Sequence, residues 1–204
     1  MAAEKAFAAG LICIALLSGC EKEVCTEPLS DDAVILAFGD SLTAGVGVSR
    51  DASYPSVLQE MTSLTVINAG VSGETTNQGL ARLTAQLENH APELLVLLEG
   101  GNDMLRKKDI SRMQRNLQQM VSLALENNTQ VLLLAVPEPN LFASPPDAYN
   151  EIAATAGIPV MNDIVTELQF DRRYKSDPVH LNEAGYYRLA QAIFDKLEGC
   201  GSLP

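Results

Sequence analysis

Short apolar runs alternate with longer amphipathic stretches from Val34 onward, and this alternation predicts repeated units of β-strand and α-helix. Five of the runs are almost continuously apolar, which is typical of strands in a parallel sheet that is covered on both faces. They span 34–38, 64–68, 94–98, 130–136 and 158–161. The pattern therefore predicts the α/β class, with a five-stranded parallel sheet inside a three-layer α/β/α sandwich.

Three of the intervening stretches have the apolar spacing of a helix that packs one face on a core. Such helices are expected over 76–89, 110–127 and 182–197. Their apolar faces are Leu80, Leu83 and Leu87 in the first, Met113, Leu117, Met120, Val121 and Leu125 in the second, and Leu189, Ala192, Ile193 and Leu197 in the third.

The N-terminus carries a mostly apolar run over 6–17, which is too short for a membrane-spanning helix of ~20 residues but fits the core of an export signal. Leu17-Ser18-Gly19-Cys20 follows at once and resembles a bacterial lipobox, in which cleavage before the cysteine leaves its thiol to carry diacylglycerol. A plain secretory signal and a buried N-terminal helix are the alternatives. We expect a lipoprotein-type signal peptide over 1–19, a tether over 20–32 and one domain over 33–204.

This organisation places the protein in the bacterial cell envelope, anchored to a membrane through Cys20 and facing the periplasm or the exterior. Of the four cysteines, Cys13 would leave with the signal and Cys20 would be acylated. Cys25 and Cys200 then remain in an oxidising compartment and are candidates for a disulfide, with two free thiols as the alternative.

Composition and charge narrow the possible partners. The chain of 204 residues suits one domain, and its 26 acidic and 14 basic residues give a net charge of −12, which repels nucleic acid. The turn Gly45-Val46-Gly47 lacks the third glycine of a dinucleotide fingerprint, and neither a phosphate loop nor a cysteine or histidine cluster with metal spacing occurs. We expect no metal, no organic cofactor and no obligate protein partner.

Polar residues cluster where three predicted strands end, at 39–42, 68–73 and 99–103. The carboxyl ends of parallel strands meet at one edge of a sheet, and the segment 177–180 before the last predicted helix reaches the same edge. A serine, a histidine, an aspartate and amide donors are thus expected in one place. The other histidine, His90, ends a predicted helix, where a solvated imidazole is the ordinary interpretation.

These residue types suit nucleophilic catalysis. The hydroxyl of Ser41 needs a base within hydrogen-bond reach, which His180 can supply, and Asp177 can accept the imidazole Nδ1–H. The backbone amides of Ser41 and Gly73 and the side-chain amide of Asn102 can surround a tetrahedral oxyanion. Taken singly, each residue has a simpler explanation as a helix cap, a tight turn or a loop hydrogen bond, so only the conjunction favours catalysis.

The segment 137–146 follows the fourth predicted strand and is rich in proline. Because it lies on the same edge, its Leu141 and Phe142 are candidates for the wall of an apolar pocket. A rigid connector is the alternative.

Four sequence blocks occur in order. They are Gly-Asp-Ser-Leu-Thr-Ala-Gly at 39–45, Val-Ser-Gly-Glu-Thr-Thr at 71–76, Gly-Gly-Asn-Asp at 100–103 and Asp-x-x-His at 177–180. Over about Val34 to Leu197 the chain resembles the SGNH, or GDSL, hydrolases, and in particular small bacterial acylhydrolases with thioesterase, arylesterase and lysophospholipase activities. The resemblance implies a flavodoxin-like fold, marks Ser41 as the nucleophile and assigns the oxyanion hole to Ser41, Gly73 and Asn102.

The expected function is hydrolysis of a small-molecule carboxylic ester, whether aryl, lysophospholipid or thio, through an acyl-enzyme on Ser41. One alternative is a carbohydrate O-deacetylase that acts on envelope glycans with the same residues. Another is a catalytically silent binding module tethered to a membrane.

Overall fold

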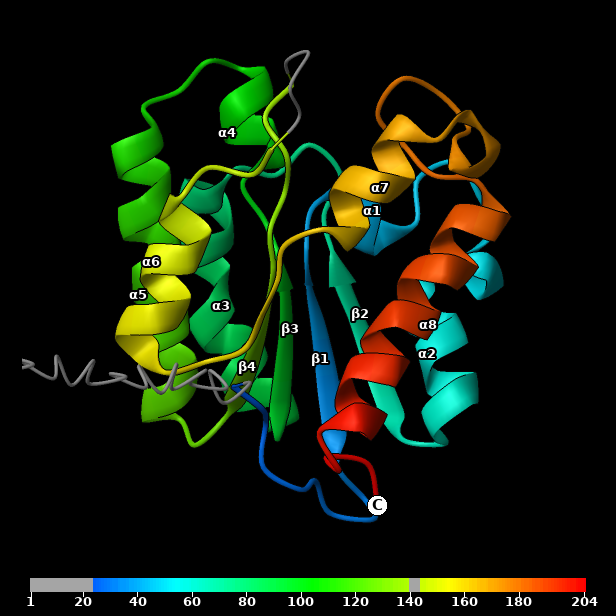
Figure 1. The fold of residues 1–204 in the computed structure, drawn as a ribbon. Helices are drawn as coiled ribbons and strands as arrows, with labels where there is room; N and C mark the ends of the chain where they lie inside the picture. The colour runs from blue at the N-terminus through cyan, green and yellow to red at the C-terminus, as the bar shows by residue number, and fades with distance from the viewer. Residues whose placement is uncertain (1–23, 140–143) are drawn as a thin grey trace, which may run out of the picture.

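A five-stranded parallel sheet in the order β2-β1-β3-β4-β5 forms the centre of the molecule in the computed structural model, which describes residues 24–139 and 144–204 (Figure 1). The strands are β1 (Val34–Gly39), β2 (Thr65–Gly70), β3 (Leu94–Leu98), β4 (Gln130–Leu134) and β5 (Val160–Met161). Each lies in or overlaps one of the five apolar runs, and all neighbours pair in parallel. The predicted α/β class and five-stranded parallel sheet are confirmed.

Helices cover both faces of the sheet. One face carries α3 (Thr76–His90), α5 (Ile110–Glu126) and α6 (Ala148–Ala156), and the other carries α2 (Tyr54–Thr62), α7 (Ile164–Phe170) and α8 (Glu183–Gly199) (Figure 1). The short helices α1 (Ser41–Ala44) and α4 (Gly101–Leu105) begin directly beyond β1 and β3, and two 3-10 turns span 50–52 and 172–174. This is the predicted three-layer arrangement.

The helices α2, α6 and α7 have no counterpart in the sequence prediction. They have nine, nine and seven residues, so each offers only two turns or so over which an apolar period can repeat. Packing on the sheet and on α5 or α8 stabilises them instead, because their apolar side chains are buried there.

One predicted core position is wrong. Leu125 was assigned to the buried face of the helix over 110–127, but its side chain is 41% exposed. The buried stripe passes from Leu117 and Val121 to Ala124, and Leu125 lies one residue, or about 100°, farther around the last turn of α5.

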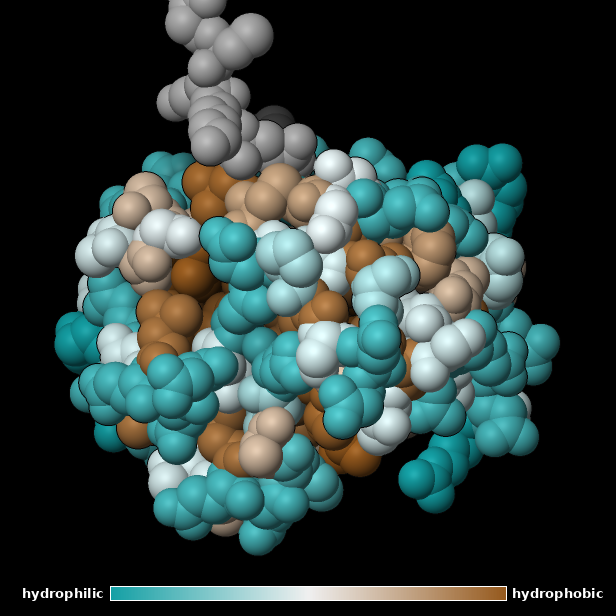
Figure 2. Space-filling view, turned by 90° about the horizontal axis from the view of Figure 1, so that it is seen from below, coloured by the Kyte–Doolittle hydropathy of each residue, from teal (hydrophilic) through white to brown (hydrophobic). Residues whose placement is uncertain are grey.

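The first described residues and the C-terminal segment meet at the amino end of the sheet. Cys25 and Cys200, the two candidates that the sequence left open as either a disulfide or free thiols, are joined by a disulfide with a Cα–Cα distance of 5.4 Å. Nearby, Thr26 Oγ1 and Ser202 Oγ lie 2.7 Å apart, and the Leu29 backbone N–H donates to Ser202 O at 2.8 Å. Figure 2 shows this end from below, with hydrophilic side chains over most of the face and hydrophobic ones in separate patches between them.

The expected signal peptide over 1–19 and Cys20 lie outside the described residues, as does the tether up to residue 23. Within 24–139 and 144–204, no helix combines the length and apolar character needed to cross a membrane.

The strand order decides where a site can form. The chain leaves β1 for β2 on one side, and β3 then pairs with β1 on the other side, so the connections diverge at the carboxyl ends of β1 and β3. Open α/β sheets bind their ligands in the crevice at such a switch point. Here α1 and α4 begin on its two sides.

Candidate active site

Ser41 is the first residue of α1 and is separated from the end of β1 by Asp40 alone. Asp40 caps this helix, because its Oδ1 accepts the Leu42 backbone N–H at 3.0 Å. The helix lasts one turn and ends at Gly45 in the left-handed conformation. The tight passage from strand to helix places Ser41 on the edge of the sheet rather than within it.

Ser41, His180 and Asp177 lie in series. Ser41 Oγ is 3.0 Å from His180 Nε2, and His180 Nδ1 is 2.7 Å from Asp177 Oδ2. A carboxylate can only accept, so the proton of the second bond belongs to Nδ1, and Nε2 is left to accept from the Ser41 hydroxyl. The geometry is that of a nucleophile, its general base and the group that orients the base.

Asp177 is held by its own turn. Its Oδ1 accepts the backbone N–H of both Val179 and His180 at 2.8 Å, and its Oδ2 faces the imidazole. These hydrogen bonds, first that of the His180 backbone and then that of its side chain, lower the pKa of Asp177 to about 2. The aspartate is therefore ionised across the range in which His180 would act as a base.

The proposed oxyanion donors lie on two other loops. Gly73 has φ +77°, a conformation that favours glycine, and Asn102 is near the start of α4. Asn102 Nδ2 donates one hydrogen to Asp40 Oδ2 at 3.0 Å, which leaves its second hydrogen available. Ser41, Gly73 and Asn102 line the same cavity.

Asp40 is a functional residue that sequence reasoning missed. It caps the helix of the nucleophile and also orients the amide of Asn102. Its burial raises the pKa of this carboxyl to about 6, although the Leu42 amide and the Asn102 side chain favour the charged form. A carboxyl placed directly before the candidate nucleophile was the available signal.

Arg106 was missed as well. It follows α4, and its Nη2 donates to Gly73 O at 2.7 Å, so it connects the Asn102 helix to the Gly73 loop. Asp103 makes a second connection, since its Oδ2 accepts the Thr76 backbone N–H at 2.8 Å and its Oδ1 the Thr76 hydroxyl at 3.0 Å. These contacts join residues that are distant in sequence, so no local sequence pattern predicts them.

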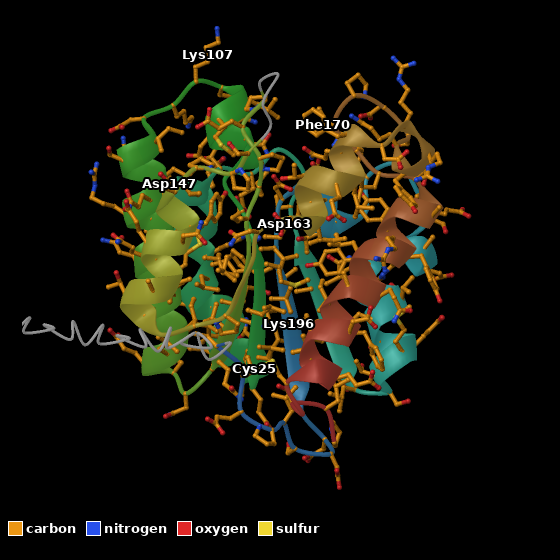
Figure 3. The ribbon with its side chains drawn as sticks, in the orientation of Figure 1. Cys25, Lys107, Asp147, Asp163, Phe170 and Lys196 are labelled. Carbon is orange, nitrogen blue, oxygen red and sulfur yellow. A yellow bond between two sulfur atoms is a disulfide. The ribbon has the colours of Figure 1, made fainter. Side chains whose placement is uncertain are left out.

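A cavity of about 700 Å³ opens beside Ser41 and His180. Its apolar walls include Leu105 and Phe170, whose side chains are 46% and 56% exposed, together with Val136 and several prolines. Phe170 lies at the same end of the molecule as Lys107, while Cys25 lies at the opposite end (Figure 3). The segment 137–146 contributes Pro137 and Pro139 to the cavity, whereas Leu141 and Phe142 lie outside the described residues.

His90, the other histidine of the chain, lies apart from this cavity. His90 is the last residue of α3, half-buried and at the end of that helix away from Gly73, so it takes no part in this site. Among the residues that the structure describes, no group of three or more histidine, cysteine, aspartate or glutamate side chains is arranged to hold a metal ion.

Residues 37–188 match the family model of the GDSL-like lipase/acylhydrolase family. The chain is 31% identical over 196 residues to esterase TesA of Pseudomonas aeruginosa, which covers 90% of this chain and 96% of the relative. It is also 31% identical over 175 residues to thioesterase 1/protease 1/lysophospholipase L1 of Escherichia coli strain K12, covering 80% and 83%.

Solved structures agree with this match. Esterase EstA from Pseudoalteromonas sp. aligns with a TM-score of 0.75 at 25% identity, covering 82% of this chain and 98% of that one. A crystal structure of TesA aligns with a TM-score of 0.74 at 27% identity, covering 82% and 99%. The chain belongs to the GDSL-like lipase/acylhydrolase family, and its enzymatic class is that of the carboxylic ester hydrolases.

Proposed function

We propose that this hydrolase cleaves carboxylic esters with Ser41 as nucleophile, His180 as general base and acid, and Asp177 as the ionised partner of the imidazole. The observation that carries the proposal is the uninterrupted series of 3.0 Å and 2.7 Å contacts from Ser41 Oγ through His180 to Asp177, beside a cavity of about 700 Å³.

The reaction follows from these positions. Ser41 Oγ attacks the ester carbonyl while His180 Nε2 takes its proton, and the carbonyl oxygen becomes an oxyanion that accepts hydrogen bonds from Ser41 N–H, Gly73 N–H and Asn102 Nδ2. The oxyanion then collapses and the C–O bond to the alcohol breaks, while His180 protonates the leaving oxygen. Water, deprotonated by His180, attacks the acyl-enzyme in the same way and releases the carboxylic acid and Ser41.

The cavity supports an acyl ester with a substantial apolar group. Its volume and its lining by Leu42, Leu105, Val136 and Phe170 favour burial of aliphatic or aromatic carbon. Relatives are described as an esterase, as a thioesterase and lysophospholipase, and as an arylesterase. We propose that the substrates of this chain are aryl, lysophospholipid or thio esters.

We further propose that the protein is a lipoprotein of the cell envelope, anchored through Cys20. Two features favour this. The Cys25–Cys200 disulfide suits an oxidising compartment, and Cys25, five residues after Cys20, lies at the opposite end of the molecule from Phe170, which lines the cavity (Figure 3). A tether there leaves the cavity facing away from the membrane. Metabolic labelling with palmitate should mark the wild type and spare Cys20→Ser, and equal labelling of both would exclude the anchor.

The catalytic proposal is tested with p-nitrophenyl esters from acetate to palmitate, using protein that begins after Cys20. We expect turnover that peaks at medium or long acyl chains and is lost in Ser41→Ala, which must unfold at an unchanged temperature. Activity confined to acetate would favour the glycan O-deacetylase instead. Turnover that survives in Ser41→Ala would reject the triad, and no turnover of any ester would favour the binding module.

A further inference from the structure

Glu99 is a fully buried carboxyl that the reaction above does not use. It directly follows β3, and its Oε2 accepts the backbone N–H of Gly100 at 3.1 Å. Its other oxygen, Oε1, receives no hydrogen bond from any described residue. Oε1 lies at 3.4 Å from the position where a Cβ on Gly79 would stand, beside Phe38 and Met120, so its surroundings are largely apolar.

Glu74 lies within hydrogen-bond reach of the Glu99 carboxyl. Glu74 is itself 5% exposed and is held by Arg82, whose Nε donates to Glu74 Oε1 at 2.7 Å and whose Nη2 donates to Oε2 at 2.5 Å. The guanidinium also donates to Ala69 O at 2.8 Å and stacks over the Phe38 ring at 3.8 Å. The two buried carboxyl groups are thus neighbours, and the Arg82 guanidinium is bound to Glu74.

Desolvation and mutual repulsion disfavour the charged form of both carboxyl groups when the two are buried as neighbours, and so favour a proton on one of them. Arg82 stabilises the charge on Glu74. Glu99 faces apolar side chains and the further negative charge of Asp40, and both its burial and these carboxylates raise its pKa well above the ordinary value. The proton therefore belongs to Glu99, which changes it from an acceptor into a donor toward Glu74.

Glu74 and Glu99 are each close in sequence to one of the proposed oxyanion donors. Glu74 directly follows Gly73, whose amide is a proposed oxyanion donor, and Glu99 lies three residues before Asn102, the side-chain donor. A hydrogen bond from Glu99 to Glu74 would connect the loop of one donor to the turn of the other, in addition to the connections made by Arg106 and Asp103.

We propose that Glu99 is a positioning residue that keeps a proton at neutral pH and donates a hydrogen bond to Glu74, so that Gly73 and Asn102 stay at the spacing an oxyanion requires. This inference rests on the proposed role of those two donors. Because the oxyanion exists only in the transition state, loss of the bond lowers kcat and leaves KM almost unchanged.

The proton is tested by infrared spectroscopy at pH 8, where Asp40, with a pKa of about 6, is ionised. A neutral carboxylic acid has a carbonyl stretch separate from the amide and carboxylate bands. We expect such a band in the wild type and in Ser41→Ala, and its loss in Glu99→Gln. A wild type without the band, or a band that persists in Glu99→Gln, would overturn the inference while leaving the catalytic proposal intact.

The positioning role is tested with p-nitrophenyl ester kinetics. Glu99→Gln keeps an N–H donor for Glu74 and should retain kcat within about threefold, whereas Glu99→Leu removes the donor and should lower kcat by about 10- to 100-fold with KM within about threefold. Glu88→Leu, the same change on the exposed face of α3, serves as the matched control. Glu99→Met replaces Glu99→Leu if the latter does not fold. A wild-type kcat in the folded apolar variant, or equal losses in the Gln and Leu variants, would exclude the role.

Discussion

The two ends of the same parallel sheet are built for different tasks. At the carboxyl end, β1 and β3 lead directly into Asp40, Ser41 and Glu99, and buried carboxyl groups with raised pKa values lie beneath a cavity. At the amino end, a disulfide between Cys25 and Cys200 joins the segment before β1 to the end of α8.

The difference shows how the fold separates activity from stability. Burial of a carboxyl group costs free energy unless hydrogen bonds or ion pairs replace the lost water. Asp40 and Glu99, both buried at this end of the sheet, carry that cost. The amino end contributes a covalent link and buried hydrogen bonds around Ser202 that no proposed catalytic step needs. Substitutions at the first end should change turnover, and those at the second should change the free energy of unfolding.

Asp177→Asn should cause the largest change. An asparagine can still accept the backbone N–H groups of Val179 and His180, but its amide no longer selects the tautomer with a free Nε2. We expect kcat for p-nitrophenyl esters to fall by about 10³- to 10⁴-fold, with an unfolding temperature within about 2 °C of the wild type. A loss of less than tenfold would contradict the assigned role of Asp177.

Removal of the Cys25–Cys200 disulfide should lower the free energy of unfolding and leave kcat almost unchanged. Among the described residues, the disulfide is the only covalent cross-link between the two segments at the amino end of the sheet. It closes a loop with a sequence separation of 175, for which chain entropy predicts a stabilisation of up to about 5 kcal/mol. The double variant Cys25→Ser and Cys200→Ser should lose about 2–5 kcal/mol in urea unfolding and keep kcat within about twofold. A large loss of kcat in folded protein would show that the two ends are coupled.

Asp40→Asn should separate stability from activity at a single position. The pKa of Asp40 is raised from 3.8 to about 6, so the folded state binds its proton more tightly than the unfolded state, and stability falls as pH rises from about 4 to 6. Above pH 6 the ionised group costs up to about 3 kcal/mol. Asparagine caps α1 equally well, so the variant should be more stable than the wild type at pH 8 and should lose this advantage at pH 4.

The same variant should turn over esters more slowly, because an amide in place of Asp40 Oδ2 no longer orients Asn102 Nδ2. Urea unfolding at the two pH values and ester kinetics at pH 8 measure both effects. A variant that is less stable at pH 8 would contradict the cost assigned to the buried charge, and a fully active variant would show that Asp40 does not orient Asn102.

Ser202→Ala should have the smallest effect. It removes the contact of Ser202 Oγ with Thr26 Oγ1 at 2.7 Å and its hydrogen bond to Thr26 O at 2.9 Å, both buried at the amino end. We expect a loss of about 1 kcal/mol in urea unfolding and an unchanged kcat. The unfolding free energy and kcat of Thr43→Ala give a comparison from the carboxyl end of the sheet. Thr43 is on α1, and its buried hydroxyl lies 3.3 Å from the hydroxyl of Tyr54 on α2.

Much of the fold was predictable because its signals are local. The five apolar runs and the periodic stretches of α3, α5 and α8 are long or uniform enough to define their elements. The helices α2, α6 and α7 were not predicted, since sequences of seven to nine residues carry too little periodicity and depend on packing for their stability.

The residues of the candidate site also fall into those that the sequence predicts and those that it does not. Ser41, Gly73, Asn102, Asp177 and His180 could be named beforehand because four short blocks place them just after strands or before a helix. Asp40, Glu99 and Arg106 could not be assigned their contacts, since their partners are up to 62 residues away and become neighbours only when the strands align.

The sequence alone determined the class of fold, the reactive residue types and the edge of the sheet at which they gather, because hydrophobic periodicity and the succession of strands and helices along the chain are properties of consecutive residues. Only the tertiary structure decided which carboxyl groups are buried with a raised pKa and which are exposed with a lowered one. Asp40 and Asp177 are the same residue type, yet burial raises the pKa of one and backbone hydrogen bonds lower that of the other. Desolvation and hydrogen bonding depend on what the whole fold brings around a side chain.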